Sequence, residues 1–257
     1  MSKSTQFDAR RAQFRALHEQ GCFLLPNPWD IGGALRLERL GFKAIASSSS
    51  ACALSLGRED YEITLTDALE HLRLLVRATQ LPVNADFENG FAAEPERVAE
   101  NVRLAIATGI AGLSIEDRDA AGLHETARAV ERVAAARQAI AASGEDVLLV
   151  ARTEAYLEGQ TDPRPVIDRL LKFAAAGADC LYAPGVKDMA VIRDMVRAVA
   201  PKPVNVLLYG QQMKVSELAA AGVRRVSLGG ALASAAWRGF DAAAKRFMEQ
   251  GTLLPRD

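Results

Sequence analysis

The sequence is poor in cysteine, in histidine and in long apolar runs. Its 257 residues include only three histidines and three cysteines, Cys22, Cys52 and Cys180. An odd number of scattered cysteines fits neither a disulfide framework nor a paired zinc motif, and it favours a reducing compartment. No stretch approaches the roughly 18 unbroken apolar residues of a membrane span. Residues 1–11 are polar and charged, unlike a signal peptide. We therefore expect a cytoplasmic protein with no membrane role.

An excess of charge of either sign is also missing. Lys and Arg total 31 against 32 for Asp and Glu, which gives a net charge of -1. This balance supplies no electrostatic attraction toward nucleic acid or an anionic membrane. Hydrophobic residues make up 49% of the chain, which is ample material for a packed core. The expected partner is therefore a small molecule.

Short apolar runs alternate with longer amphipathic segments along the whole chain, a pattern typical of buried parallel strands and their crossover helices. Eight strands are predicted, at residues 22–25, 44–46, 83–86, 112–115, 147–151, 180–182, 204–207 and 225–228. No Pro/Ser-rich linker or change of composition divides the chain. Eight such units favour a single (β/α)8 TIM barrel spanning residues 1–257 over a doubly wound sheet.

Helical periodicity lies between these strands. The clearest helices are predicted at residues 67–79, 94–108, 125–142 and 163–176. Gly41, Gly109, Gly177 and Gly222 follow helical segments and precede strands, where a left-handed helix cap is expected. Residues 5–20 predict an extra N-terminal helix that caps the barrel bottom, and the Ala-rich residues 231–250 predict the eighth barrel helix.

Reactive groups are expected at the carboxyl ends of the barrel strands, where the loops converge. The segments that follow the second to fifth strands are Ser47–Ser50, Asp86–Gly90, Glu116–Asp117 and Arg152–Glu154. Carboxylates crowded there either raise one another's pKa or gather around a cation. Hard oxygen donors without His or Cys favour Mg²⁺, with Mn²⁺ as the alternative. Arg152 is then placed to hold a substrate carboxylate.

Each of these residues also has a purely structural interpretation. A strand-end acid is often an N-cap of the next helix. The serine run is either an ordinary loop or a row of backbone donors to a substrate oxygen. Arg152 could simply pair with Glu154 or Glu116. Of the histidines, His18 and His71 are expected in packing or surface roles, whereas His124 follows the fourth strand and stays a catalytic candidate.

Six motifs in order carry a family resemblance between Phe14 and Trp237. They are Leu25-Pro26-Asn27-Pro28-Trp29-Asp30, Gly41-Phe42-Lys43-Ala44, Ser55-Leu56-Gly57-Arg58-Glu59-Asp60, Asp86-x-Glu88-x-Gly90-Phe91, Ser114-Ile115-Glu116-Asp117 and Ala151-Arg152-Thr153-Glu154-Ala155. With these motifs the chain resembles the isocitrate lyase and phosphoenolpyruvate mutase superfamily. The resemblance implies a barrel whose eighth helix is exchanged with a partner subunit, within a homotetramer built from two dimers.

The resemblance also implies a set of site residues. Mg²⁺ would bind mainly through Asp86, with Asp60, Glu88 and Glu116 completing the shell directly or through water. Ser48 and Ser49 match the positions whose backbone holds substrate oxygens, and Arg152 matches the substrate-binding arginine. Ser50 and Asp86 are expected to contact the substrate as well. Members of the superfamily make or break a bond beside a 2-oxo or 2-hydroxy carboxylate, passing through a pyruvate-like enolate.

Departures from the family pattern bear on the reaction. The stretch Arg118–His124 lacks both the cysteine loop of isocitrate and methylisocitrate lyases and the Lys-x-Asn pair of phosphonate enzymes. We therefore expect a Mg²⁺-dependent carbon-carbon lyase or decarboxylase. Arg152 and Glu116 would serve in catalysis, and His124, Tyr156 or a metal-bound water would handle the proton. The alternatives are carbon-phosphorus chemistry of the phosphonopyruvate type and a barrel that binds a carboxylate without catalysis.

Overall fold

The computed structural model describes residues 3–253, so residues 1–2 and 254–257 of the predicted domain lie outside it. Eight parallel strands form its main sheet: β1 (Phe23–Leu25), β2 (Ile45–Ala46), β3 (Val83–Asp86), β4 (Gly112–Glu116), β7 (Leu148–Arg152), β8 (Cys180–Tyr182), β9 (Val204–Leu207) and β10 (Arg225–Ser227). Every predicted strand is present, with its ends displaced by at most one residue. The apolar runs located the strands because their residues are buried on both faces of the sheet.

The sheet curls into a nearly closed barrel, as predicted. Its strand order is β1-β10-β9-β8-β7-β4-β3-β2. The two edge strands meet where the N–H of Ala46 donates to the carbonyl oxygen of Pro26 at 3.0 Å. The side-chain amide of Asn27 also donates to the carbonyl oxygen of Ser47, at 2.8 Å. The ends of β1 and β2 are therefore joined at the same rim that carries the predicted site.

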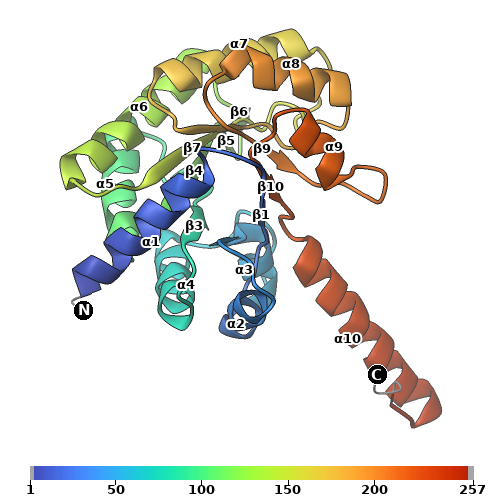
Figure 1. Ribbon diagram of the computed structural model, residues 1–257. Coiled ribbons are helices and arrows are strands. Elements are labelled where there is room, and N and C mark those ends of the chain that lie inside the picture. The colour runs from blue at the N-terminus through green and yellow to red at the C-terminus, as the bar shows by residue number, and fades with distance from the viewer. Residues whose placement is uncertain (1–2, 254–257) are drawn as a thin grey trace.

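Helices surround the barrel (Figure 1). They are α1 (Lys3–Leu17), α2 (Ile31–Arg39), α3 (Ser49–Ser55), α4 (Leu65–Ala78), α5 (Pro95–Ile106), α6 (Thr126–Ser143), α7 (Pro163–Ala175), α8 (Met189–Val199), α9 (Val215–Ala220) and α10 (Ala231–Gln250). None of the helices in the described part of the chain is long and apolar enough to cross a membrane. A short antiparallel hairpin, β5 (Arg118–Asp119) and β6 (Gly122–Leu123), follows β4 and was not predicted.

Two of the predicted helix-capping glycines show why glycine is needed there. Gly109 and Gly177 have φ values of 95° and 101°, which residues with a Cβ rarely adopt. A Cβ on Gly109 would lie 2.6 Å from the ring of Phe7, and one on Gly177 would lie 2.7 Å from Arg137. Both turns therefore combine a left-handed backbone with close packing.

The N-terminal helix α1 closes the bottom of the barrel, as predicted. Phe14 of this helix is fully buried and packs with Leu25, Ala111 and Leu148, and the last two lie at the starts of β4 and β7. The guanidinium of Arg11 donates to the carbonyl oxygen of Ile110 at 3.1 Å. These contacts fix the end of the barrel that lies opposite the predicted site.

His18 is a packing residue in this seal. It is 8% exposed, and its ring contacts Phe14 and Phe23 with centroid distances of 4.7 and 4.9 Å. Its Nδ1 donates to the carbonyl oxygen of Phe14 at 2.7 Å, and its Nε2 lies 3.5 Å from Nη1 of Arg225. Burial, followed by the positive charge of Arg225, lowers the pKa of His18 to about 3.

This low pKa makes the stability of the protein depend on pH. His18 stays neutral in the folded chain but becomes protonated in the unfolded chain below its ordinary pKa of 6.5. Its contribution to the free energy of unfolding is therefore complete above pH 6.5 and is lost as the pH falls toward 3. Between pH 7.5 and 5 we expect a loss of about 2 kcal/mol from this group. Urea unfolding of the wild type and of His18→Gln at both pH values measures it. Equal changes in the two proteins would contradict the expectation.

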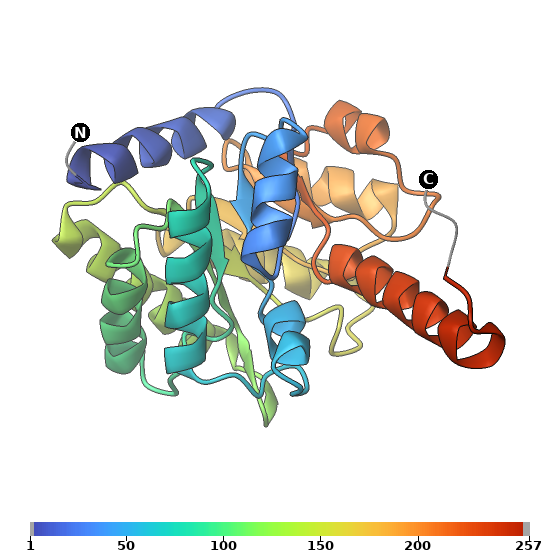
Figure 2. The same cartoon turned by 90° about the horizontal axis from the view of Figure 1, so that it is seen from below.

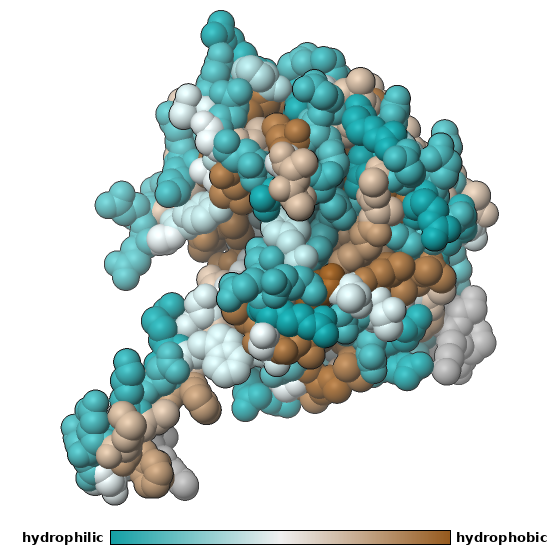
Figure 3. Space-filling model, turned by 180° about the vertical axis from the view of Figure 1, so that it is seen from behind, coloured by the Kyte–Doolittle hydropathy of each residue, from teal (hydrophilic) through white to brown (hydrophobic). Residues whose placement is uncertain are grey.

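The last helix, α10, projects away from the barrel in two perpendicular views (Figures 1 and 2). Ala233 is its one buried residue among those described. Trp237, Phe240, Phe247 and Met248 are 40%, 63%, 64% and 77% exposed, and the space-filling view shows apolar side chains on the projecting segment (Figure 3). The predicted eighth helix is thus present but covers none of its own barrel along most of its length.

Candidate active site

The predicted site residues follow four strands that are neighbours in the sheet, in the order β2, β3, β4 and β7. Asp86 is paired in register with Ser114, and Glu116 with Arg152. Parallel strands in register bring their carboxyl ends to one rim. The acids and the arginine predicted from strand ends therefore meet in space.

Arg152 is the centre of this cluster. Its Nη1 lies 2.9 Å from Oε1 of Glu116 and 3.3 Å from Oδ1 of Asp86, and its Nε donates to Glu154. The guanidinium carbon stands 5.2 Å from the centroid of the Tyr182 ring. Burial acts to lower the pKa of Arg152, but Glu116 and Glu154 outweigh it and hold the pKa well above its ordinary value. Arg152 is therefore a permanent cation, and both pairings considered from the sequence are present.

Asp86 is oriented by the serines that follow β2. Its Oδ2 accepts hydrogen bonds from the backbone N–H of Ser49 at 3.0 Å and from the Ser49 hydroxyl at 2.9 Å. The Ser47 hydroxyl accepts the N–H of Asp86 at 2.8 Å. Ser48 caps α3 by accepting from Ala51 and lies 3.2 Å from the Ser50 hydroxyl. The serine run thus combines both sequence interpretations, because Ser48 is a cap and Ser49 donates into the site.

Glu88 and Glu116 are both buried, at 4% and 2% exposure. Burial, and then the charges of Asp86 and Asp60, raise the pKa of Glu88 to about 8. Burial also raises the pKa of Glu116 well above its ordinary value, against the lowering effect of Arg152. The Oε1 of Glu88 is buried with no hydrogen-bond partner. The residue has a positive φ of 44°, which is rare outside glycine.

Asp60 and Tyr61 enter the site from the loop before α4. Desolvation of its carboxyl group, followed by the charge of Asp86, raises the pKa of Asp60. Tyr61 donates its hydroxyl to Oε2 of Glu116 at 2.7 Å, with a strained φ of 66°. Arg118 of β5 stacks over the Tyr61 ring at 4.7 Å. The sequence analysis did not identify Tyr61 as a site residue. Its position next to Asp60, a predicted metal ligand, is the signal that could have indicated it.

The charges of the cluster are unbalanced. Five carboxyl groups, those of Asp60, Asp86, Glu88, Glu116 and Glu154, interact with the single guanidinium of Arg152. Such a group is stable only with bound protons or with a cation. The unpartnered Oε1 of Glu88 and the all-oxygen donor set both fit Mg²⁺ or Mn²⁺.

The fit is to a hydrated ion. Across residues 3–253, no three His, Cys, Asp or Glu side chains are arranged to ligate one ion together. Mg²⁺ commonly retains several waters and binds through one or two carboxylates. Of the two modes implied by the resemblance, direct and water-mediated, the second agrees better with this geometry.

A small cavity lies beneath the cluster. It has a volume of about 40 Å³, and Asp86, Arg152, Tyr182 and Arg225 are among the residues that line it. This is room for roughly two or three water molecules. A dicarboxylate therefore does not fit inside it unless the lining side chains move.

His124 and Tyr156 are not brought to the cluster. The backbone of His124 donates to Asp117 at 2.8 Å, and its Nδ1 lies 3.8 Å from Oδ2 of Asp119. Burial, and then Arg132, lower its pKa. The hydroxyl of Tyr156 is buried without a partner. The ring of His124 lies beside Asp119 of the hairpin β5–β6. The charges that act on it are those of Asp119, Arg128, Arg132 and Arg169, none of which belongs to the Arg152 cluster.

These features define a TIM barrel with an acid-lined mouth around one buried arginine. The family model described as phosphoenolpyruvate phosphomutase matches residues 14–248. The chain therefore belongs to this family, within the isocitrate lyase and phosphoenolpyruvate mutase superfamily of lyases and mutases that act on small carboxylates.

Individual relatives agree with this placement. An uncharacterized protein of Mycobacterium tuberculosis H37Rv is 33% identical over 95% of this chain and 91% of its own length. The 2-methylisocitrate lyase of Escherichia coli K12 is 32% identical over 72% of this chain and 67% of its own. The oxaloacetate decarboxylase of Chromohalobacter salexigens is 31% identical over 88% of this chain and 80% of its own length. Among solved structures, a protein described as a lyase/mutase from Burkholderia cenocepacia J2315 is 44% identical in sequence to this chain. The two structures superpose with a TM-score of 0.93 over 96% of this chain and 91% of that one.

Proposed function

We propose that the protein is a divalent-metal-dependent lyase or decarboxylase that cleaves a carbon-carbon bond in a small 2-oxo or 2-hydroxy carboxylate. The observation that carries the proposal is the convergence of Asp86, Glu88 and Glu116 on Arg152 at the barrel mouth. The lyase and decarboxylase among the relatives support the same chemistry.

The side chains divide the work as follows. Asp86 would hold Mg²⁺ or Mn²⁺, with Asp60, Glu88 and Glu116 acting through bound water. When bound, the metal would stabilise negative charge on a substrate oxygen. Arg152 would bind the substrate carboxylate, exchanging one of its carboxylate partners for it. The N–H of Ser49 would add a hydrogen bond to a substrate oxygen once Asp86 turns toward the metal.

Proton handling is assigned to Glu116 and Tyr61. In a 2-oxo substrate such as oxaloacetate, loss of carbon dioxide leaves the electron pair of the broken bond on the carbon next to the 2-oxo group, as a pyruvate enolate, and that carbon must then receive a proton. In a 2-hydroxy substrate, the hydroxyl group must lose its proton as the bond breaks, the 2-hydroxy carbon becomes the new carbonyl carbon, and the electron pair stays on the carbon of the other fragment, which must then receive a proton. The Tyr61 hydroxyl is held by Glu116 at 2.7 Å. Burial and Glu116 raise the pKa of Tyr61, so the hydroxyl keeps its proton at neutral pH. His124, also considered from the sequence, has no contact that supports this role.

A substrate panel tests the proposal. Purified protein with Mg²⁺ or Mn²⁺ is incubated with oxaloacetate, citramalate, 2-methylisocitrate and related acids, and release of pyruvate, glyoxylate or carbon dioxide is followed. We expect turnover of at least one acid. If none of the acids were turned over, the proposed lyase or decarboxylase activity would be rejected. Phosphate release from phosphonopyruvate would instead favour the carbon-phosphorus alternative, and binding without product would favour a carboxylate-binding barrel.

We also propose that α10 packs against a partner subunit, giving a dimer of dimers, and that the chain is one barrel domain in the cytoplasm. The exposed Phe240 and Phe247, each more than 60% accessible, support the packing, because apolar side chains in such numbers rarely stay in water. The three free cysteines fit a reducing compartment.

Charge placed on the α10 surface is expected to break this assembly. In the double variant Phe240→Asp/Phe247→Asp, assembly would bury an aspartate against the partner at each of the two exposed positions. This burial would cost several kcal/mol of association free energy. Light scattering after gel filtration is expected to show a tetramer for the wild type and a smaller species for the variant. Asp241→Asn, on the same helix, is the matched control. An unchanged mass for the double variant, or a monomeric wild type, would contradict the packing.

A further inference from the structure

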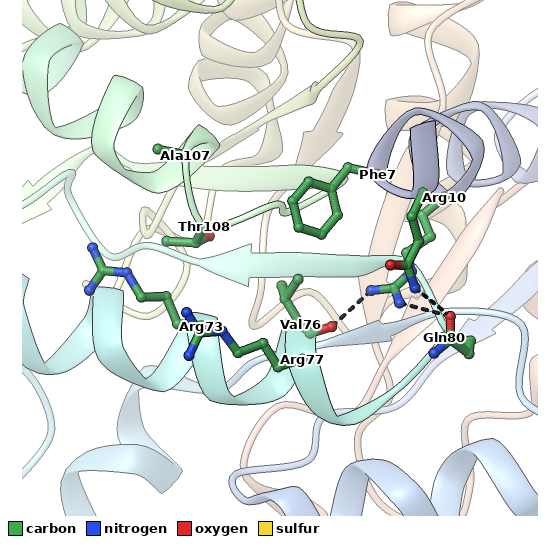
Figure 4. Close-up of a pocket in the computed structure, with 9 residues that line it drawn as sticks. Phe7, Arg10, Arg73, Val76, Arg77, Gln80, Ala107 and Thr108 are labelled. Atoms are coloured by element: carbon green, nitrogen blue, oxygen red, sulfur yellow. Dashed lines mark hydrogen bonds between the residues drawn. The ribbon is translucent and has the colours of Figure 1, made fainter. Parts of the chain in front are cut away.

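A second cavity lies at the end of the barrel opposite the active site. Its volume is about 590 Å³, within the range of small-molecule sites. It is an open cavity lined by residues of α1, by the C-terminal half of α4 and by the residues that follow α4 and α5 (Figure 4). Helices α4 and α5 lead directly into β3 and β4, whose far ends carry Asp86 and Glu116. None of its lining residues belongs to the catalytic mouth.

The lining of this cavity is strongly basic. It includes three arginines, Arg10, Arg73 and Arg77, and no Asp or Glu. Glu38, which accepts the backbone N–H of Gln80 at 2.9 Å and acts to raise the pKa of Arg10, stands outside the lining. Figure 4 shows Arg73 and Arg77 along α4, facing the same opening as the ring of Phe7. The cavity therefore presents positive charge that its own walls do not neutralise.

Arg10 has a structural role that accounts for part of this arrangement. It is 6% exposed, and its two terminal nitrogens donate to the carbonyl oxygen of Val76 at 2.8 Å and to Oε1 of Gln80 at 2.9 Å. The first contact satisfies a carbonyl near the end of α4, as basic side chains often do. Its Nε is buried with no partner, so the guanidinium is held rigidly but incompletely bonded.

Capping does not account for Arg73 and Arg77. They stand one turn apart on α4, where like charges repel, and both are exposed. Neither forms an ion pair among the described side chains, a property that they share with other exposed arginines such as Arg193. They differ from those arginines because both line the cavity that also holds the buried Arg10. Three guanidinium groups that line one cavity without a carboxylate in its walls are the arrangement expected around a bound anion.

We propose that this cavity binds a small organic phosphate. Planar guanidinium groups match phosphate oxygens in charge and in hydrogen-bond geometry. The Phe7 ring supplies an apolar wall for the organic part, and the side chain of Gln80 offers an amide beside it. The site is separate from catalysis and does not depend on the proposed lyase activity.

Calorimetric titration with pyrophosphate tests the site. Full-length protein is titrated in EDTA, because without a metal the acidic mouth repels the probe. We expect one saturable site per chain in the wild type and an affinity lower by about tenfold or more in Arg73→Ala/Arg77→Ala, which removes two charged contacts. Arg193→Ala is the matched control, since Arg193 is an exposed arginine of α8 outside the cavity.

The outcomes separate the site from general anion binding. Both exposed arginines lie on the helix surface, and circular dichroism and the melting temperature establish that the double variant is folded. Unchanged affinity in the double variant, equal losses in Arg193→Ala, or no saturable binding by the wild type would each overturn the proposal. Arg77→Ala alone is expected to give an intermediate loss.

Discussion

Arg152→Lys is expected to lower kcat/KM for the best substrate of the panel by about a hundredfold to a thousandfold. The guanidinium simultaneously contacts Glu116, Asp86 and Glu154. A lysine keeps the charge but offers a single ammonium group, so it cannot bridge these carboxylates and also bind a substrate carboxylate at two points. We expect the loss in both KM and kcat, because the arginine would hold the substrate and order the acids around it.

Arg137→Lys is the matched control for this change. Arg137 forms an ion pair with Asp179 at 2.8 Å, at the opposite end of β7 from Arg152. The two substitutions are chemically identical, and a general effect of shortening a paired arginine would appear in both. If Arg152→Lys retained activity equal to that of Arg137→Lys, substrate binding by Arg152 would be excluded.

Asp86→Asn is expected to lower activity by at least about a hundredfold at a metal concentration that saturates the wild type. The substitution keeps the size of the side chain and can still accept from Ser49, but it removes the charge that would hold the metal. It also removes the acceptor that faces Arg152 at 3.3 Å. Steady-state rates over a wide range of Mg²⁺ concentrations distinguish weaker metal binding, which excess metal restores, from a direct loss in the chemical step.

An exposed aspartate provides the control. Asp194 pairs with Arg197 on the surface of α8, and Asp194→Asn is expected to leave rates unchanged because exposed ion pairs contribute little. Activity of Asp86→Asn close to that of Asp194→Asn would contradict a metal-holding role for Asp86.

The barrel could be predicted because its determinants are local. Apolar runs such as Val147–Ala151 alternate with amphipathic helices, and glycines such as Gly109 mark the turns between them. The convergence of Asp86, Glu116 and Arg152 could also be predicted from the sequence, because residues at the carboxyl ends of neighbouring parallel strands lie at one rim of the barrel. The structure adds how the cluster is bonded, with Arg152 at its centre.

Other features depend on contacts that no local pattern reports. The hairpin β5–β6 places His124 beside Asp119, and the pairing of two-residue strands leaves no periodic signal in the sequence. Tyr61 reaches Glu116 from a loop position with a positive φ, a conformation that the residue type does not announce. The cavity with Arg73 and Arg77 is formed by helices distant in sequence, so its basic lining was not visible before the fold was known.

Calorimetric titration of Mg²⁺ into metal-free wild-type protein tests most directly whether a cation completes the mouth. We expect one binding event per chain, an accompanying rise in the melting temperature, and loss of both in Asp86→Asn. Absence of Mg²⁺ and Mn²⁺ binding by the wild type, or undiminished binding by Asp86→Asn, would show that the crowded carboxyl groups are neutralised by protons and Arg152 alone.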